Sequence, residues 1–137
     1  MRIEQLMELS YRGHHTAPTP EDNSPLHDLT DIYGDDIYSP NALRYYGTGD
    51  TVSDRESLSV IMAARGNPNM MVTIYRAVPK NVSEINSGDW VTLSKNYAKK
   101  HGDAWVRDGV IISKKVAART LFTNGDSMNE FGYWGQF

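Results

Sequence analysis

The sequence has 137 residues, which is enough for one domain of ordinary size but not for two. The 14 basic residues are outnumbered by 17 acidic ones, and the resulting charge of -3 gives no indication of nucleic-acid binding through a basic surface. Because cysteine is absent, disulfides, cysteine-ligated zinc and cysteine nucleophiles are excluded. No apolar run approaches the roughly 20 residues that span a bilayer, and Met1–His15 lacks the apolar core of a signal peptide. We therefore expect a cytoplasmic protein with no membrane contact.

The first part of the chain predicts short helices and irregular segments. Apolar residues recur at helical spacing in Met1–Arg12, which predicts an amphipathic helix. His14–Asp50 is rich in proline and glycine, yet it carries too many aromatic residues for a linker. We expect this segment to be ordered and irregular, with a short helix over Ser39–Tyr46 in which Ser39 is the cap.

A longer helix is predicted to begin at Ser53 or Asp54 and to end before Gly66. If Ser53 is the cap, Glu56 is placed to close a capping box. The later sequence is β-branched and aromatic, which is typical of strands. Strands are predicted over 70–78, 90–94, 109–116, 120–123 and 129–134, with a short helix over 95–101. This order indicates one α+β domain over 1–137, with a helical and irregular part at 1–69 and a strand-rich part at 70–137.

Several common motifs are missing from the sequence. It has no phosphate-binding loop of the Walker or Rossmann type, no HExxH and no GxSxG. His14 and His15 are adjacent, so in a strand they would face opposite ways, and this argues against a histidine metal site. The acidic residues between Asp28 and Asp36 lack the ligand spacing of a calcium loop. We therefore expect no metal.

Three short blocks place unusual side chains in predicted strands. Arg76 lies within an apolar strand, where its guanidinium needs an anion or a carboxylate unless it faces solvent. Thr92 and Ser94 share one face of the next strand, either as binding hydroxyls or as ordinary polar-face residues. Glu130 lies in a short aromatic strand, although glutamate is disfavoured in strands. No single block assigns a function.

Together the three blocks resemble the mono-ADP-ribosyltransferases of the toxin-like arginine/serine/glutamate class. Ser94 follows Arg76 by 18 residues, and Glu130 follows Ser94 by 36 residues. The runs YRAVP, GDWVTLSKNYAKKHG and NEFGY are similar to the small ADP-ribosyltransferase domains of phages and mobile elements, mainly over Thr73–Tyr133. The resemblance implies an ADP-ribosyltransferase-like split β-sandwich with N-terminal helices, in which NAD lies in the cleft between the sheets.

The resemblance also implies a role for each residue. Arg76 would contact the phosphate and ribose of NAD through charge-assisted hydrogen bonds. Thr92 and Ser94 would shape the nicotinamide pocket, with Ser94 holding the side chain of Arg76 or Glu130. Glu130 would be the catalytic residue, binding a hydroxyl of the nicotinamide ribose and stabilising an oxocarbenium-like transition state. Tyr97 is either part of the wall of the NAD pocket or a core aromatic residue, and the core is favoured.

The sequence departs from the family pattern at the hydroxyl motif and before the glutamate. Thr92 replaces a serine and Leu93 a threonine, while Met128 stands where arginine-modifying members carry a second acidic residue. Arginine is therefore a disfavoured acceptor, and Asn, Asp, Glu, Ser, Thr, a nucleic acid and water stay open. Asn129 and Asp126 are candidates for placing the acceptor.

The function implied by the resemblance is transfer of ADP-ribose from NAD to a host macromolecule inside a bacterial cell, with release of nicotinamide. The family context suggests a host protein as the partner, for example a defence protein such as a CRISPR effector. A first alternative is an inactive protein of the same fold that occludes a partner through its tyrosine-rich segment His14–Asp54. A second is a structural domain in which Arg76 and Glu130 form a buried salt bridge.

Overall fold

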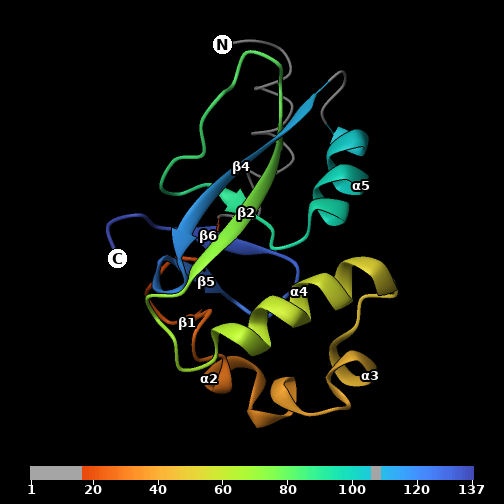
Figure 1. Cartoon of the computed structure of the whole chain (residues 1–137), viewed down its shortest axis with the longest axis vertical. Coiled ribbons are helices and arrows are strands. Elements are labelled where there is room, and N and C mark those ends of the chain that lie inside the picture. Colours follow the sequence, from red (N-terminus) through yellow and green to blue (C-terminus); the bar gives the residue numbers. More distant parts are fainter. Residues whose placement is uncertain (1–16, 106–108) are drawn as a thin grey trace.

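The structure is a computed structural model that describes residues 17–105 and 109–137. In this part of the chain, short helices come first and two antiparallel sheets follow (Figure 1), which confirms the α+β class. The helix predicted over Met1–Arg12 lies outside the described residues. Within the two described ranges, no helix is both long and apolar enough to cross a membrane.

Short elements occupy the irregular segment that precedes the longest helix. They are β1 (Ser24–Pro25), α2 (Thr30–Tyr33), the 3₁₀ helix η1 (Asp35–Tyr38) and α3 (Ala42–Tyr46). The helix predicted over Ser39–Tyr46 is therefore shorter than expected. The hydroxyl of Ser39 accepts the backbone N–H of Asn41 at 3.2 Å, which places Ser39 in a turn before the helix rather than at its cap.

Helix α4 (Thr51–Ala64) begins earlier than its apolar pattern indicates. Its N-cap is Asp50, whose carboxylate accepts the backbone N–H of Ser53 at 3.3 Å and the Ser53 hydroxyl at 2.7 Å. The predicted capping box between Ser53 and Glu56 is wrong, because Ser53 lies inside the helix as a donor to the true cap. Gly66, at φ 73°, follows the end of the helix as predicted.

The strands form two sheets that touch at one bridge. Strand β2 (Met71–Val78) pairs along its length with β4 (Val110–Ala117). The other sheet consists of β1 and three further short strands, β3 (Trp90–Val91), β5 (Leu121–Thr123) and β6 (Phe131–Tyr133). Its strand order is β1-β5-β6-β3. Tyr75 and Thr92 exchange two backbone hydrogen bonds of 2.9 and 3.0 Å, and these join β2 to the residue that follows β3.

Two helical segments connect the strands of the two sheets. Helix α5 (Lys95–Trp105) follows β3 and packs against β2, while the 3₁₀ helix η2 (Ala118–Thr120) connects β4 to β5. The strand predicted over 90–94 is shorter than expected because the chain turns into α5, and the strand predicted over 129–134 is reduced to β6.

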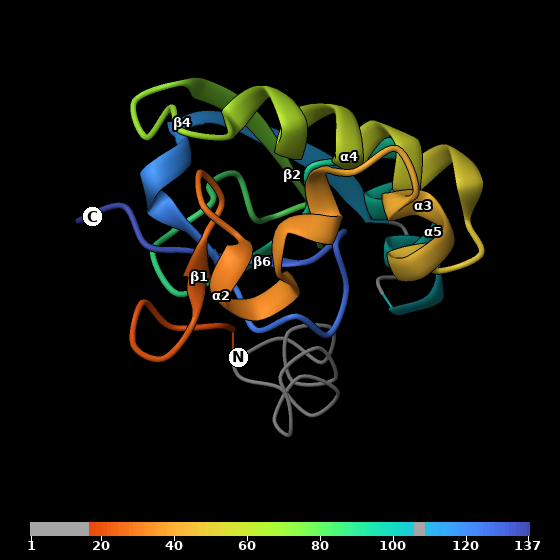
Figure 2. The same ribbon diagram turned by 90° about the horizontal axis from the view of Figure 1, so that it is seen from below.

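One hydrophobic core joins the helices to both sheets. Helix α4, which runs beside β2 in Figure 2, contributes Leu58, Ile61 and Ala64, and these pack in the same cluster as Ile74 of β2. Residues alternate between the two faces of a strand, so Arg76 lies on the same face of β2 as Ile74. Its side chain is only 14% exposed.

The N-terminal part of the described chain crosses β6 at very short range. The indole N–H of Trp134 donates to the carbonyl oxygen of Pro18 at 2.6 Å. A Cβ atom at Gly132 would lie 2.2 Å from the same oxygen, a distance that real Cβ atoms do not reach. Glycine at position 132 is therefore required for this close approach.

We expect Gly132→Ala to destabilise the protein by about 1–3 kcal/mol, because the added methyl group forces the Pro18 segment or β6 to move. Thermal or urea unfolding measures the loss. Ser83→Ala, at an exposed position, is the control and should leave stability unchanged. If Gly132→Ala were as stable as that control, the crossing would be looser than the structure shows.

The buried phenol of Tyr33 makes the stability of the fold depend on pH in the alkaline range. Burial raises the pKa of Tyr33 to about 12 from its ordinary value of 10.0. The folded state thus favours the neutral phenol, and this contribution is complete below pH 10 and lost as the pH rises toward 12. We expect the free energy of unfolding to fall across this range more steeply in the wild type than in Tyr33→Phe. Urea titrations at several pH values measure the slopes, and the exposed Tyr45→Phe should behave as the wild type does.

Candidate functional site

Strand pairing brings the second and third sequence blocks together. Strand β3 pairs with β6 with Trp90 opposite Gly132 and Val91 opposite Phe131. Continuing this register by one residue places Glu130 opposite Thr92, which is the residue that bridges to β2 on its other side. Glu130 itself precedes β6 rather than lying within it, as the residue that follows a turn. The candidate site is the junction of β3, α5 and the start of β6.

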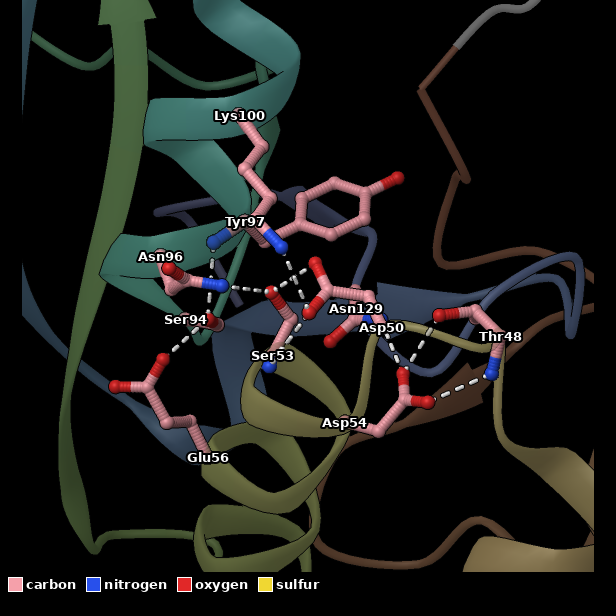
Figure 3. Close-up of polar contacts among 10 residues, drawn as sticks. All are labelled: Thr48, Asp50, Ser53, Asp54, Glu56, Ser94, Asn96, Tyr97, Lys100 and Asn129. Atoms are coloured by element: carbon pink, nitrogen blue, oxygen red, sulfur yellow. Dashed lines mark hydrogen bonds and ion pairs between the residues drawn. The ribbon is translucent and has the colours of Figure 1, made fainter.

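Ser94 is the N-cap of α5. Its hydroxyl oxygen accepts the backbone N–H of Tyr97 at 3.1 Å, as expected of a serine that precedes the first helical residue. The same hydroxyl donates to the carboxylate of Glu56 at 2.7 Å, and the backbone N–H of Ser94 donates to the Thr92 hydroxyl at 3.1 Å. Figure 3 shows Ser94 between α5 and the Glu56 side chain, which comes from α4. The expectation that Ser94 holds Arg76 or Glu130 is therefore wrong, since its hydroxyl is already bound at the helix cap.

Tyr97 makes the direct contact with Glu130. Its phenol donates to one carboxylate oxygen of Glu130 at 2.8 Å, and both side chains are half-buried. One face of the Tyr97 ring stacks on the ring of the exposed His101, which lies one helical turn later, with the ring centroids 3.9 Å apart. Tyr97 is thus part of the polar junction, whereas the sequence alone favoured a core position.

The side chain of Arg76 is held at the beginning of β3. Its guanidinium donates to the carbonyl oxygen of Trp90 at 3.0 Å, and its Nε lies 3.9 Å from the carboxylate of Asp89. An ion pair with a carboxylate was one of the two environments predicted for an arginine in this strand. The carboxylate belongs to Asp89 and not to Glu130, and so the predicted salt bridge between Arg76 and Glu130 is wrong.

The residues proposed to place an acceptor occupy different environments. Asn129 is completely buried, and its carboxamide contacts Ser57 and Asp54 of α4. It therefore cannot contact an acceptor. Asp126 is exposed in a turn, where its backbone N–H donates to the side chain of Asn124 at 3.1 Å.

Helix α4 carries polar residues that the sequence analysis did not assign to the site. Its first two turns contact the site elements at four positions. Figure 3 shows the contacts of Ser53 with Asn96, Glu56 with Ser94 and Asp54 with Asn129. In the fourth contact, Ser57 donates to Asn129. The signal was present in the sequence, because Ser53, Glu56 and Ser57 share one helical face by their spacing. A polar helical face is usually read as solvent-exposed, and here Ser53 and Ser57 are fully buried.

The tyrosines of the N-terminal segment serve mostly within the molecule. The hydroxyl of Tyr46 donates to the carbonyl of Tyr33 at 2.7 Å, and the two rings meet edge to face. The hydroxyl of Tyr38 accepts the backbone N–H of Leu29 at 3.0 Å, while its ring lies beneath the guanidinium of Arg65. Tyr45 is different, with 59% of its surface exposed. Tyrosine content is therefore a weak argument for a contact surface in the described part of this segment.

No protein-family model matches the chain, and neither does any curated protein or any solved structure. Within the described ranges, no three histidine or acidic side chains lie together in a way that could hold a metal ion. What the junction can do follows from its side chains, which are a carboxylate, a phenol that donates to it, a stacked imidazole and a nearby guanidinium. The carboxylate can accept hydrogen bonds from hydroxyl groups, and a guanidinium can bind an anion through charge-assisted hydrogen bonds.

We expect the Tyr97 and Glu130 side chains to be energetically coupled. A double-mutant cycle of Tyr97→Phe and Glu130→Ala, measured by urea unfolding at pH 7, should give a coupling energy of about 0.5–1.5 kcal/mol. The pair Tyr45→Phe and Glu130→Ala is the control and should be additive, since Tyr45 is exposed elsewhere. Additive effects in the first cycle would show that the Tyr97 hydroxyl does not bind Glu130 in solution.

Proposed function

We propose that this protein is an NAD-dependent mono-ADP-ribosyltransferase that modifies a host macromolecule in a bacterial cell. The observation that carries the proposal is the contact of 2.8 Å between the Tyr97 hydroxyl and the Glu130 carboxylate, at the junction where the hydroxyl block meets the glutamate block. The two sheets that meet at Tyr75 and Thr92 are, in this proposal, the halves of the split β-sandwich of that enzyme class. NAD is the substrate and lies across the junction.

Glu130 is the catalytic residue of the proposed reaction. Among the described residues its hydrogen-bond partner is Tyr97, which binds one oxygen of the carboxylate. The other oxygen can then accept a hydroxyl of the nicotinamide ribose. As the bond between the ribose anomeric carbon and nicotinamide breaks, its electron pair leaves with the nicotinamide nitrogen and the sugar gains positive charge. A fixed carboxylate beside that charge lowers the barrier.

Arg76 binds the phosphates of NAD in the proposed complex. Its side chain projects from the same face of β2 as the core residue Ile74, and Trp90 and Asp89 orient the guanidinium beside β3. A guanidinium whose rotamer is already fixed loses little entropy when it binds a phosphate. Thr92 and Ser94 act by shaping the start of α5, and through it the position of Tyr97.

The acceptor is not an arginine in this proposal. Met128, at the position of the second acidic residue in arginine-modifying enzymes, is 1% exposed and belongs to the core. That position therefore offers no carboxylate to orient a guanidinium. A nucleophile on the host macromolecule attacks the anomeric carbon and loses its proton, with water as the competing acceptor that gives hydrolysis of NAD. A host defence protein such as a CRISPR effector is the partner that the family context suggests.

We expect millimolar NAD to raise the melting temperature of the wild-type protein, since a ligand that binds only the folded state stabilises it by mass action. We also expect the wild type to release nicotinamide from NAD when host-cell extract supplies the acceptor. Glu130→Gln should keep the fold and lower the rate of release by about 10²–10³-fold, the range for loss of one preorganised electrostatic group. Glu84→Gln, at an exposed position, is the matched control.

A wild type that neither shifts with NAD nor releases nicotinamide would contradict the proposal. The biological effect of Glu130→Gln then tests the alternative of an inactive protein that occludes a partner. An effect that survives this substitution supports occlusion, because binding of a partner needs no catalytic carboxylate.

A further inference from the structure

We infer that Asn129 is a positioning residue for Glu130, held in place by the first two turns of α4. The consequence for catalysis rests on the proposed function, whereas the geometric part concerns this chain alone. Asn129 directly precedes Glu130 at the turn that leads into β6, and its exposure is 0%. A carboxamide at this depth needs partners, since burying it without hydrogen bonds is unfavourable.

Helix α4 binds both ends of the Asn129 carboxamide. The hydroxyl of Ser57 donates to Oδ1 at 2.6 Å, and Nδ2 donates to Oδ1 of Asp54 at 2.9 Å (Figure 3 draws the second contact). One end of the amide accepts and the other donates, so the two contacts are compatible with one orientation of the side chain. Asp54 and Ser57 are themselves at 1% and 0% exposure, so these hydrogen bonds are shielded from bulk water.

The hydrogen bonds of Asp54 and Ser57 with Asn129, which we call the clamp, continue through Asp54 to the loop before α4. The carboxylate of Asp54 also accepts the backbone N–H and the hydroxyl of Thr48, each at 2.7 Å. On the other side, the backbone N–H of Asn129 donates to the Ser127 hydroxyl at 3.1 Å, and the N–H of Glu130 donates to the Ser127 carbonyl at 3.2 Å. The turn that carries Glu130 is thus fixed from within and from α4.

This arrangement has a consequence for Glu130 that packing alone would not give. A leucine would fill the space of Asn129, but it would make no directional hydrogen bonds that fix the orientation of the turn relative to α4. With the turn fixed, the carboxylate of Glu130 meets the Tyr97 hydroxyl. Tyr97 lies in α5, and α5 is held to α4 by the hydrogen bond between Ser94 and Glu56. In enzymes a misplacement of about 1 Å at the reacting group can cost about 10²-fold in rate.

The geometric part is tested without NAD. Ser57→Ala removes the hydroxyl at one end of the carboxamide and leaves Asp54 in place. Ser59→Ala, two residues further on and exposed, is the matched control. In ¹⁵N relaxation measurements we expect the order parameter of the Glu130 amide to fall from about 0.85 toward about 0.6 in Ser57→Ala and to stay high in Ser59→Ala. An unchanged value in Ser57→Ala would overturn the inference.

The catalytic part is tested with NAD at a temperature where circular dichroism shows every variant to be folded. We expect kcat for nicotinamide release to fall about tenfold in Ser57→Ala with KM for NAD unchanged, because the binding groups are intact and the carboxylate is misplaced. A kcat equal to that of the wild type would assign Asn129 a purely structural role and overturn the inference. A wild type without any release instead overturns the proposed function, and the relaxation measurement then decides the geometric part by itself.

A polarity swap identifies the contact responsible. Asn129→Asp sets a second carboxylate against Asp54 in a buried place, so we expect a large loss of melting temperature. Adding Asp54→Asn returns one donor and one acceptor to the pair, and the double variant should recover stability together with part of kcat. If the double variant were no better than Asn129→Asp, the contact between these two side chains would not be what holds the turn.

Discussion

The buried carboxylate of Asp54 is the interaction on which the arrangement of this molecule depends. An ionised carboxylate is unfavourable away from water unless hydrogen bonds replace its hydration. Among the described residues no cation contacts Asp54, and its donors are the backbone and hydroxyl of Thr48 and the amide of Asn129. The loop before α4, the helix itself and the turn before β6 must therefore meet at one point.

Strand register carries this constraint from α4 to the site. The turn at Asn129 leads into β6, whose pairing with β3 sets Glu130 opposite Thr92. Thr92 is also bonded to Tyr75, so the same residue joins the larger sheet to β2. The chain turns into α5 at Ser94, and the cap brings Tyr97 to Glu130. The short strands β5 and β6 are also held by hydrophobic packing, since Leu121, Phe131 and Tyr133 belong to the core.

Local sequence signals predicted the elements that depend on local physics. The β-branched run of β2, the end of α4 at Gly66 and the presence of α5 follow from propensity and turn chemistry. Two-residue strands such as β1 carry no periodic pattern of their own, and their existence depends on a partner far along the chain. The start of α4 was misplaced for a similar reason, since residues 50–54 include four residues of the types that cap helices, and only the fold selects Asp50.

The sequence indicated individual residues of the candidate site but not the contacts among them, because the partners lie far apart in the chain. Glu130 and Tyr97 were both named in the sequence, but their contact depends on pairing of β3 with β6. The environment of Asn129 could not be predicted, because its partners on α4 lie 72 and 75 residues earlier in the chain. Ser94 was assigned to the nicotinamide pocket by resemblance, whereas the structure engages its hydroxyl at a helix cap.

These assignments separate the residues that the fold explains from those that it does not. Capping of α5 accounts for Ser94, and the clamp to α4 accounts for Asn129, so neither residue requires a ligand. Glu130 is different, because it is a half-buried carboxylate with one oxygen bound by Tyr97, and its charge has no cation among the described residues. A neutral side chain at this position would have a lower desolvation cost, although an apolar one would lose the hydrogen bond with Tyr97. In the proposed function, this carboxylate meets the ribose of NAD, which gains positive charge as nicotinamide begins to leave.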